Sequence, residues 1–182
     1  MEVFSQHGFR GTTVDEIATV AAISKPNLLY YFPTKDSIYR ALFDRLLKTW
    51  LDPLRSLNPD GDPIEEIVSY ILRKLEMARQ YPRESRLFAT EVVAGAPHLR
   101  DALSGPLKSL VDERCEVFLR WMDDGRLARM EPRHLIFSIW ATTQHYADFD
   151  VQVRDVLGDA SANRYDDAKA FLTRLYTKGL TP

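Results

Sequence analysis

The stretch "TTVDEIATVAAISKPNLLYYFPTK", from Thr12 to Lys35, decides the fold. Thr13 and Glu16 have the spacing of a capping box, in which the threonine hydroxyl accepts an N–H of the first helical turn and the glutamate accepts the threonine N–H. Ser24 can cap a second helix, and Pro26 fits the first turn of that helix, where no backbone donor is lost. The stretch therefore predicts two short helices joined by a tight turn.

Two short helices joined in this way form the helix-turn-helix plan. In proteins that use it to bind DNA, the second helix lies in the major groove and directs its N-terminal residues toward the bases. We therefore expect the helix that begins after Ser24 to read DNA. Against this expectation, basic and acidic side chains balance between Met1 and Arg45, which leaves no net electrostatic footprint for DNA.

The rest of the chain has the apolar periodicity of amphipathic helices. Apolar side chains recur three and four residues apart, and no comparable stretch alternates with period two, so the fold is predicted to be all-α. Asp62-Pro63 and Glu131-Pro132 mark helix starts, and Gly105-Pro106 is expected to form a turn. Pro53 is expected to end or kink the long helix that starts near Lys35.

Length and composition limit the classes of protein. A chain of 182 residues with 45% hydrophobic residues can bury the core of one ordinary domain, or of a small and a medium one. The longest apolar runs are too short to span a bilayer and no signal peptide opens the sequence, so we expect a cytoplasmic protein with no membrane partner. Cys115 is the only cysteine and the four histidines are scattered, so neither a disulfide nor a metal or other cofactor is predicted.

Residues 8–42, "GFRGTTVDEIATVAAISKPNLLYYFPTKDSIYRAL", resemble the DNA-binding region of the TetR family of transcriptional repressors. The segments "LLYYFPTKDSIY", "TWLDPL", "ESRLFATEVVAGAPHL" and "HLIFSIWATTQHYADFDVQV" further resemble the pyrimidine-utilisation regulators of that family, which respond to uracil and related bases. The resemblance implies a short helix-turn-helix DNA-binding domain at 1–45 and a larger antiparallel helical domain for effector binding and dimerisation at 46–182. It also implies that Met1 lies inside the first helix of the family pattern.

The same resemblance assigns roles in DNA binding. Side chains near the starts of the second and fourth helices are expected to hold phosphates, because helix starts present free N–H groups and a positive dipole end. Within the reading helix, Asn27 can pair with adenine, Lys25 with guanine, and Pro26 can contact a thymine methyl group. Tyr30 and Tyr31 could instead be half-buried core aromatics. The expected DNA-binding residues are Thr12, Thr13, Ser24, Lys25, Pro26, Asn27, Tyr30, Tyr31 and Lys35.

The most unusual helix runs from Pro132 to Phe149. It is apolar on nearly every side before it becomes polar near Gln144, so we expect it to be buried between its own core and a partner subunit. The resemblance implies that it pairs, together with a helix near 163–179, with the two-fold copies of both in a homodimer.

Gln144 offers the donors and the acceptor that a pyrimidine edge requires, and Trp50 and Trp140 offer faces for a flat ring. Tyr70 and Lys74 lie one helical turn apart on a neighbouring helix. The expected ligand-binding residues are therefore Trp50, Tyr70, Lys74, Trp140 and Gln144. In the alternative interpretation both tryptophans are core residues, a backbone carbonyl satisfies Gln144, and Lys74 points to solvent.

These observations predict a dimeric repressor of a near-palindromic double-stranded DNA operator, released by a small effector, with uracil and thymine as the candidates. The effector would shift the long helix from Lys35 to Trp50 like a lever and spoil the spacing of the reading helices, which is about 34 Å in such dimers. A lipophilic effector such as a drug or fatty acid is the alternative. A remoter one is a small hydrolase with Cys115 as nucleophile and His145 as base, although no oxyanion loop accompanies them. We expect no catalytic residue.

Overall fold

The protein is described by a computed structural model that covers every residue from Met1 to Pro182 and contains helices and no strand. The all-α prediction is confirmed. The elements are α1 (Glu2–Gly11), α2 (Val14–Val20), α3 (Lys25–Tyr31), α4 (Lys35–Arg55), α5 (Pro63–Gln80), α6 (Pro82–Val93), α7 (Arg100–Ala102), the π-helical turn η1 (Leu103–Leu107), α8 (Lys108–Asp123), α9 (Pro132–Asp148), α10 (Asp150–Leu157), the 3-10 turn η2 (Gly158–Asn163) and α11 (Arg164–Leu180).

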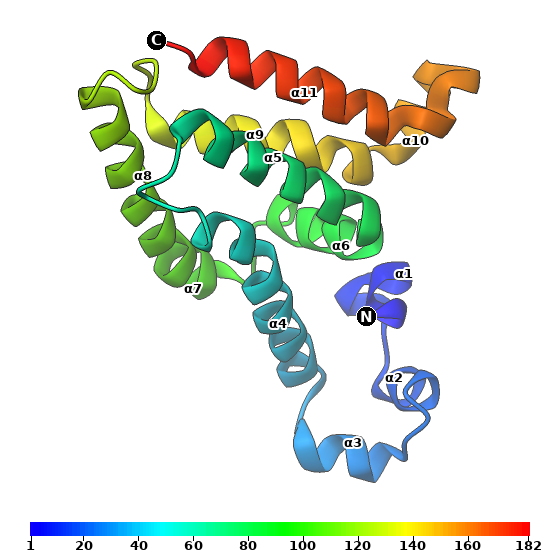
Figure 1. Cartoon of the computed structure of the whole chain (residues 1–182). Helices are drawn as coiled ribbons and strands as arrows, with labels where there is room; N and C mark the ends of the chain where they lie inside the picture. Colours follow the sequence, from blue (N-terminus) through cyan, green and yellow to red (C-terminus); the bar gives the residue numbers. More distant parts are fainter.

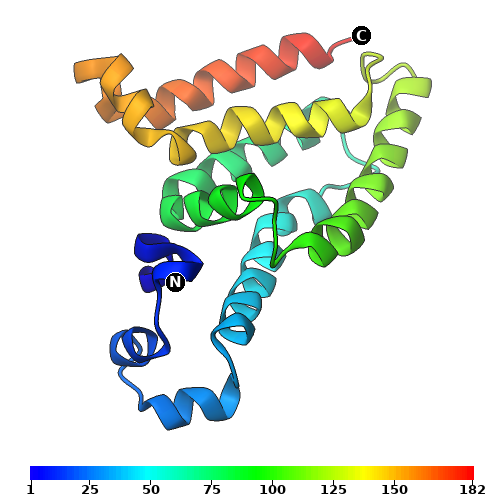
Figure 2. The ribbon, with the colours of Figure 1, turned by 180° about the vertical axis from the view of Figure 1, so that it is seen from behind.

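The helices form a small group and a large group that are connected by α4 (Figure 1). The small group contains α1, α2 and α3, and α3 lies at the end of the molecule farthest from the C-terminus. In the large group α5, α9 and α11 run side by side, as the view from behind also shows (Figure 2). α4 therefore leads from the expected DNA-reading end to the centre of the larger group.

Local signals fix where several helices begin. The capping box of Thr13 and Glu16 is present, with the Thr13 N–H donating to Glu16 Oε2 at 2.8 Å. Ser24 caps α3 by accepting the Asn27 N–H, and Pro26 lies in the first turn as expected. The predicted caps Asp62 and Glu131 open α5 and α9. Thr34 and Ser37 form a second capping box at the start of α4.

Two prolines lie inside helical segments, where the sequence predicted a helix end or kink at Pro53 and a turn at Pro106. α4 continues through Pro53 and ends two residues later, at Arg55. The proline removes one backbone hydrogen bond close to the end of the helix, where the loss is small. The turn predicted at Gly105-Pro106 is wrong, because both residues lie in η1, which continues directly into α8.

Two apolar cores hold the helices together. The large core lies among α5, α8, α9 and α11 and includes the fully buried Ile71, Phe118 and Ile136. The small core joins Phe4 of α1 and Phe43 of α4 to residues of α6. The helix-turn-helix part is therefore packed against α6 as well as connected through α4. Position 45, the expected boundary between domains, falls inside α4.

α9 buries one face and exposes the other within the single chain. Ile136, Ile139 and Thr143 are fully buried on the inner face, whereas the Phe137 side of the helix is exposed to solvent. A helix that is apolar on nearly every side thus keeps an uncovered apolar surface when the chain is taken alone. None of the helices has the length and apolar character that a bilayer crossing requires.

Candidate functional site

The expected reading helix α3 presents its polar N-terminal residues to solvent. Lys25, Pro26 and Asn27 are exposed, and Leu28 is buried beneath them. Lys25 forms an ion pair with Asp15 of α2 at 2.8 Å. Both partners are exposed, so the pair is weak and can open for a nucleic-acid acceptor.

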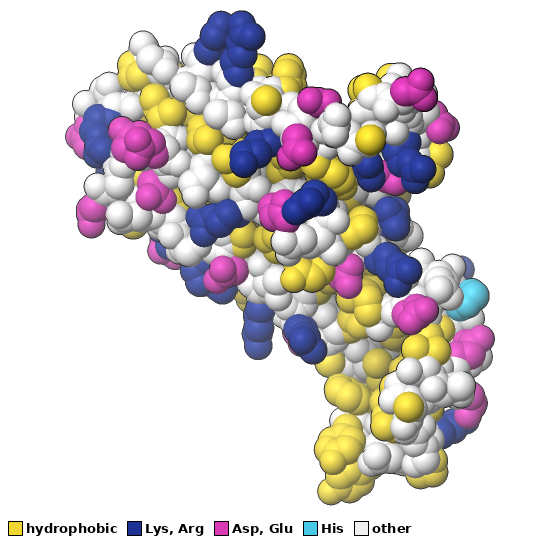
Figure 3. Space-filling view, turned by 45° about the vertical axis from the view of Figure 1, so that its right-hand side comes forward, with side chains coloured by type: hydrophobic (Ala, Val, Ile, Leu, Met, Phe, Trp, Pro, Cys, Tyr) yellow, Lys and Arg dark blue, Asp and Glu magenta, His cyan; other side chains and the backbone are white.

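The two tyrosines of α3 are also exposed. Tyr30 is 81% and Tyr31 is 68% exposed, and their rings meet edge to face with centroids 5.2 Å apart. The interpretation of both as half-buried core aromatics is therefore wrong. Exposed apolar side chains gather at this tip of the molecule (Figure 3). Aromatic side chains left in water at the end of a helix-turn-helix are available for contact with a duplex.

Thr12, which was expected to contact a phosphate, is buried in the protein. The residue is only 1% exposed, and its hydroxyl donates to the Gly8 carbonyl at 2.7 Å. The Thr12 hydroxyl therefore has a protein partner, and the contact of this residue with a phosphate stays a prediction. Thr13 is exposed at the start of α2, where its hydroxyl and N–H are both engaged by Glu16.

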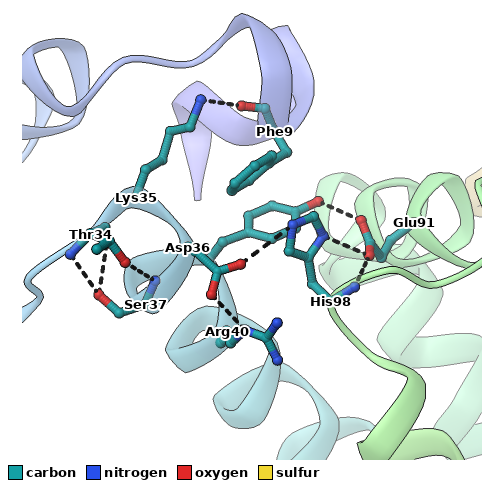
Figure 4. Close-up of polar contacts among 9 residues, drawn as sticks. Phe9, Thr34, Lys35, Asp36, Ser37, Arg40, Glu91 and His98 are labelled. Atoms are coloured by element: carbon teal, nitrogen blue, oxygen red, sulfur yellow. Dashed lines mark hydrogen bonds and ion pairs between the residues drawn. The ribbon is translucent and has the colours of Figure 1, made fainter.

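Lys35 is also directed into the protein. Its ammonium donates to the carbonyl oxygens of Phe9 and Thr12, each at 2.7 Å, and lies 4.6 Å from the centroid of the Phe9 ring (Figure 4). The side chain thus joins the start of α4 to the segment between α1 and α2. The Lys35 ammonium thus has protein partners in this structure, and its contact with a phosphate stays a prediction.

The five expected ligand-binding residues lie on α4, α5 and α9, and α5 packs against both of the other helices. Trp50 is buried on α4, and the Lys74 ammonium of α5 lies 5.4 Å from the centroid of its ring. Trp140 of α9 donates its indole N–H to the Tyr70 hydroxyl of α5 at 2.7 Å. Gln144 is half-buried one turn beyond Trp140. The structure therefore joins four of the five residues in two direct contacts.

Lys74 is 3% exposed, so the alternative that it points to solvent is wrong. Burial lowers the pKa of the Lys74 ammonium to about 7, and the Asp148 carboxylate opposes part of that shift. Burial also raises the pKa of Asp148, which accepts a hydrogen bond from Ser85 at 2.5 Å. Sequence reasoning missed Ser85 and Asp148. Trp140, Gln144 and Asp148 follow one another at intervals of four residues and therefore share one face of a helix. That spacing was the signal that could have pointed to Asp148.

Several polar groups in this region have no partner within the chain. The indole N–H of Trp50 is buried without a hydrogen bond. The half-buried Gln144 amide accepts or donates no hydrogen bond within the chain, so a backbone carbonyl does not satisfy it, and the Lys74 ammonium contacts the Trp50 ring. Because fully buried donors are nearly always paired in folded proteins, the unpaired Trp50 indole N–H is the feature of this region that indicates a ligand.

The groups required by the hydrolase alternative do not form a catalytic pair. Cys115 lies in the large apolar core, where burial raises the pKa of its thiol. His145 is exposed, and its ring stacks on Phe149 with centroids 5.0 Å apart. No group of three histidine, cysteine, aspartate or glutamate side chains is placed to hold a metal ion.

Comparison with known proteins assigns the chain to a family. Residues 1–42 match the family described as bacterial regulatory proteins, tetR family, and residues 43–182 match the C-terminal region of YcdC-like proteins. The protein belongs to the TetR family. It is 45% identical to the HTH-type transcriptional regulator RutR of Escherichia coli K12, over 100% of this chain and 87% of that regulator. The resemblance seen in the sequence is thereby confirmed, and the chain is a transcriptional regulator rather than an enzyme.

Two solved structures share the fold of this chain. A TetR/AcrR-family regulator from Thermobifida fusca superimposes with a TM-score of 0.69 at 18% identity, covering 98% of this chain and 92% of that one. AibR, solved with isovaleryl coenzyme A and operator DNA, gives a TM-score of 0.63 at 16% identity, with 80% of each chain covered. As a TetR-family member the protein is a ligand-responsive, DNA-binding regulator that acts as a dimer.

Proposed function

We propose that this TetR-family regulator is a repressor whose effector is a pyrimidine base, uracil or thymine, bound where α4, α5 and α9 meet. The observation that carries the proposal is the buried Trp50 indole N–H, which has no hydrogen-bond partner and lies beside the buried Lys74 side chain. The identity of 45% with RutR over the whole chain supports it, as does the resemblance to pyrimidine-utilisation regulators.

The chemistry of a pyrimidine base suits these groups. Its edge alternates ring N–H donors with carbonyl acceptors, and the Gln144 amide can both donate to it and accept from it. The Trp50 indole N–H and the Lys74 ammonium can each donate to a ring carbonyl. The Trp140 ring, held by the hydrogen bond to Tyr70, supplies a flat apolar face. A lipophilic effector would leave these donors unpaired at a cost of about 1–3 kcal/mol each.

The operator would be read by α3. Asn27 and Lys25 would pair with base edges, and Pro26 would contact a thymine methyl. Tyr30 would also face the groove, and Tyr31 would contact the sugar-phosphate backbone. We assign residues 1–45 to DNA binding and residues 46–182 to effector binding and dimerisation. We place the regulator in the cytoplasm, where operator DNA is accessible.

The dimer would form through α9 and α11, whose exposed faces carry Phe137, Phe171 and Leu175. α4 would act as the lever of the switch, because it extends from the reading end to Trp50 at the effector site. Effector binding would favour the arrangement in which the two reading helices no longer match successive major grooves.

Calorimetric titration of the full chain with uracil tests the effector. We expect saturable binding by the natural protein and by Gln152→Ala, which changes an exposed glutamine of α10. Gln144→Ala should weaken binding at least about tenfold, since it removes hydrogen bonds worth roughly 1.4 kcal/mol or more. No heat with millimolar uracil or thymine would reject the pyrimidine effector and leave the TetR-family assignment intact.

A further inference from the structure

α6 has polar contacts at both of its ends, and each end faces a different part of the molecule. Near its start, Ser85 donates to the Asp148 carboxylate at 2.5 Å, and Arg86 donates to the Ala147 carbonyl at 3.1 Å. Both acceptors belong to the end of α9. Asp148 also interacts electrostatically with Lys74. The start of α6 is therefore bound to one side of the proposed effector site.

Near the other end of α6, the buried Glu91 carboxylate has both oxygens occupied. The Tyr39 hydroxyl of α4 donates to Oε2 at 3.2 Å. Oε1 accepts the backbone N–H of His98 at 2.8 Å and lies 3.0 Å from Nδ1 of the same residue (Figure 4). Burial, and then the neighbouring carboxylate, raise the pKa of Tyr39 above its ordinary value, so its hydroxyl remains a donor.

His98 extends the connection to the reading end. Its Nε2 lies 3.5 Å from the carboxylate of Asp36, in the first turn of α4. Its ring centroid lies 4.3 Å from that of Phe9 and 5.0 Å from that of Tyr39. The Phe9 carbonyl is in turn held by Lys35 (Figure 4). One histidine therefore touches α1 and α4 while it is bound to α6 through Glu91.

A buried carboxylate imposes a geometry that apolar packing does not. Side chains in the small core could slide past one another, whereas Glu91 is stable only when its donors from α4 and from the segment after α6 are both in place. A displacement of α6 at its Asp148 end must either carry Tyr39 and His98 with it or leave this carboxylate unpaired. Such a contact is either made or broken, and energetic coupling between two sites requires an element of that kind.

We propose that Glu91 and His98 are positioning residues that couple the effector site to the DNA-reading helices through α6. Neither residue lies on the reading helix α3 or among the expected effector-binding residues. The route runs from Asp148 and Ser85 along α6 to Glu91, and from there through Tyr39 and His98 to the first turn of α4. The identity of the effector in this scheme rests on the proposed function, whereas the connection itself does not.

Two conservative variants test the coupling. Tyr39→Phe removes one donor to Glu91, and His98→Phe removes the ring nitrogens while keeping an aromatic ring against Phe9. Tyr165→Phe is the matched control, since it removes a partly buried tyrosine hydroxyl that bonds to backbone carbonyls of α5 and α9. The DNA is a duplex selected by the full chain from a random-sequence pool.

The first readout is the ratio of operator Kd values with and without uracil. We expect this ratio to fall at least about fivefold in Tyr39→Phe and His98→Phe and to stay unchanged in Tyr165→Phe, while the uracil Kd without DNA stays within about twofold for all. If the ratio is kept and only the melting temperature falls, the contacts are merely structural and the proposal is overturned.

The second readout needs no effector. Binding of the selected duplex should slow amide hydrogen exchange in residues 82–99 of the natural protein, and the double variant Tyr39→Phe, His98→Phe should lose this protection. If the natural protein binds no uracil, the pyrimidine effector fails and the exchange result alone decides the connection. Equal protection in the natural protein and the double variant, or no protection in the natural protein, overturns the proposed coupling through α6.

Discussion

At the scale of single residues, local patterns predicted contacts made by neighbours in sequence and failed where the partner is distant. Ser24 caps α3 because its acceptor geometry depends only on the next turn. Lys35 and Thr12 were assigned to phosphates, yet the Lys35 ammonium binds a carbonyl 26 residues earlier in the chain. That contact exists only once α1 has packed beside α4, and no spacing in the sequence reports it.

Lys74 gives a prediction for the pH dependence of stability. Its pKa is about 7 in the folded chain and about 10.5 when unfolded, so between these values the unfolded chain holds a proton that the folded chain has released. Stability should rise with pH across this window, because the cost of burying the charge is full below about pH 7. Lys74→Met should therefore be more stable than the natural protein by a few kcal/mol at pH 7, with the difference shrinking toward pH 10.

Urea unfolding of both proteins at several pH values from 6.5 to about 9.5 measures this difference. Lys48→Met, which changes an exposed lysine of α4, is the control and should show no such trend. A difference between Lys74→Met and the natural protein that is constant with pH would show that Lys74 does not titrate in this range.

At the scale of elements, the C-terminal end of α4 is held by two arginines that the sequence analysis did not single out. Arg114 of α8 donates to the carbonyls of Leu57 and Arg55 at 3.2 and 3.1 Å, and Arg73 of α5 donates to the Pro53 carbonyl at 3.0 Å. The last carbonyls of a helix have no partner within it. These arginines therefore fix the end about which a moving α4 would turn.

Arg114→Met should lower the free energy of unfolding by about 2 kcal/mol, because it leaves two carbonyls at the end of α4 without their charged donor. The control Arg129→Met removes an exposed arginine and should change stability by about 0.5 kcal/mol or less. Urea unfolding at neutral pH compares the three proteins. Equal stability of Arg114→Met and the natural chain would mean that water satisfies these carbonyls without loss.

Helix starts were predictable because Asp62-Pro63 and Glu131-Pro132 act through the adjoining turn. The course of the chain from α6 to α8 was not, since Gly105-Pro106 is typical of a turn but lies in a π-helical segment. The contacts of the neighbouring helices decide that geometry, and local preference does not. For the proposed effector site, the sequence pointed to residues on α4, α5 and α9, and it missed Asp148 and Ser85, whose contact joins two different helices.

At the scale of the whole molecule, the exposed apolar faces of α9 and α11 form the surface through which we expect two chains to associate. Phe137 is 47% and Phe171 is 59% exposed, on two neighbouring helices of the large group. A TetR-family regulator acts as a dimer, and burial of apolar surface is the main favourable term in association. A charged side chain at the centre of this apolar surface should therefore prevent the dimer from forming.

Phe171→Asp should convert the protein from a dimer into a monomer of 21.0 kDa, as measured by sedimentation equilibrium. Val93→Asp is the control, because Val93 is 88% exposed at the end of α6 and should leave the dimer intact. The Phe171→Asp monomer should retain uracil binding, since Trp50, Lys74 and Gln144 come from one chain, but it should lose most of its operator affinity. In a dimer, the second reading helix binds its half-site intramolecularly once the first is bound, which raises the operator affinity. A monomer lacks this increase in affinity. A Phe171→Asp protein that stays dimeric would place the dimer on another face.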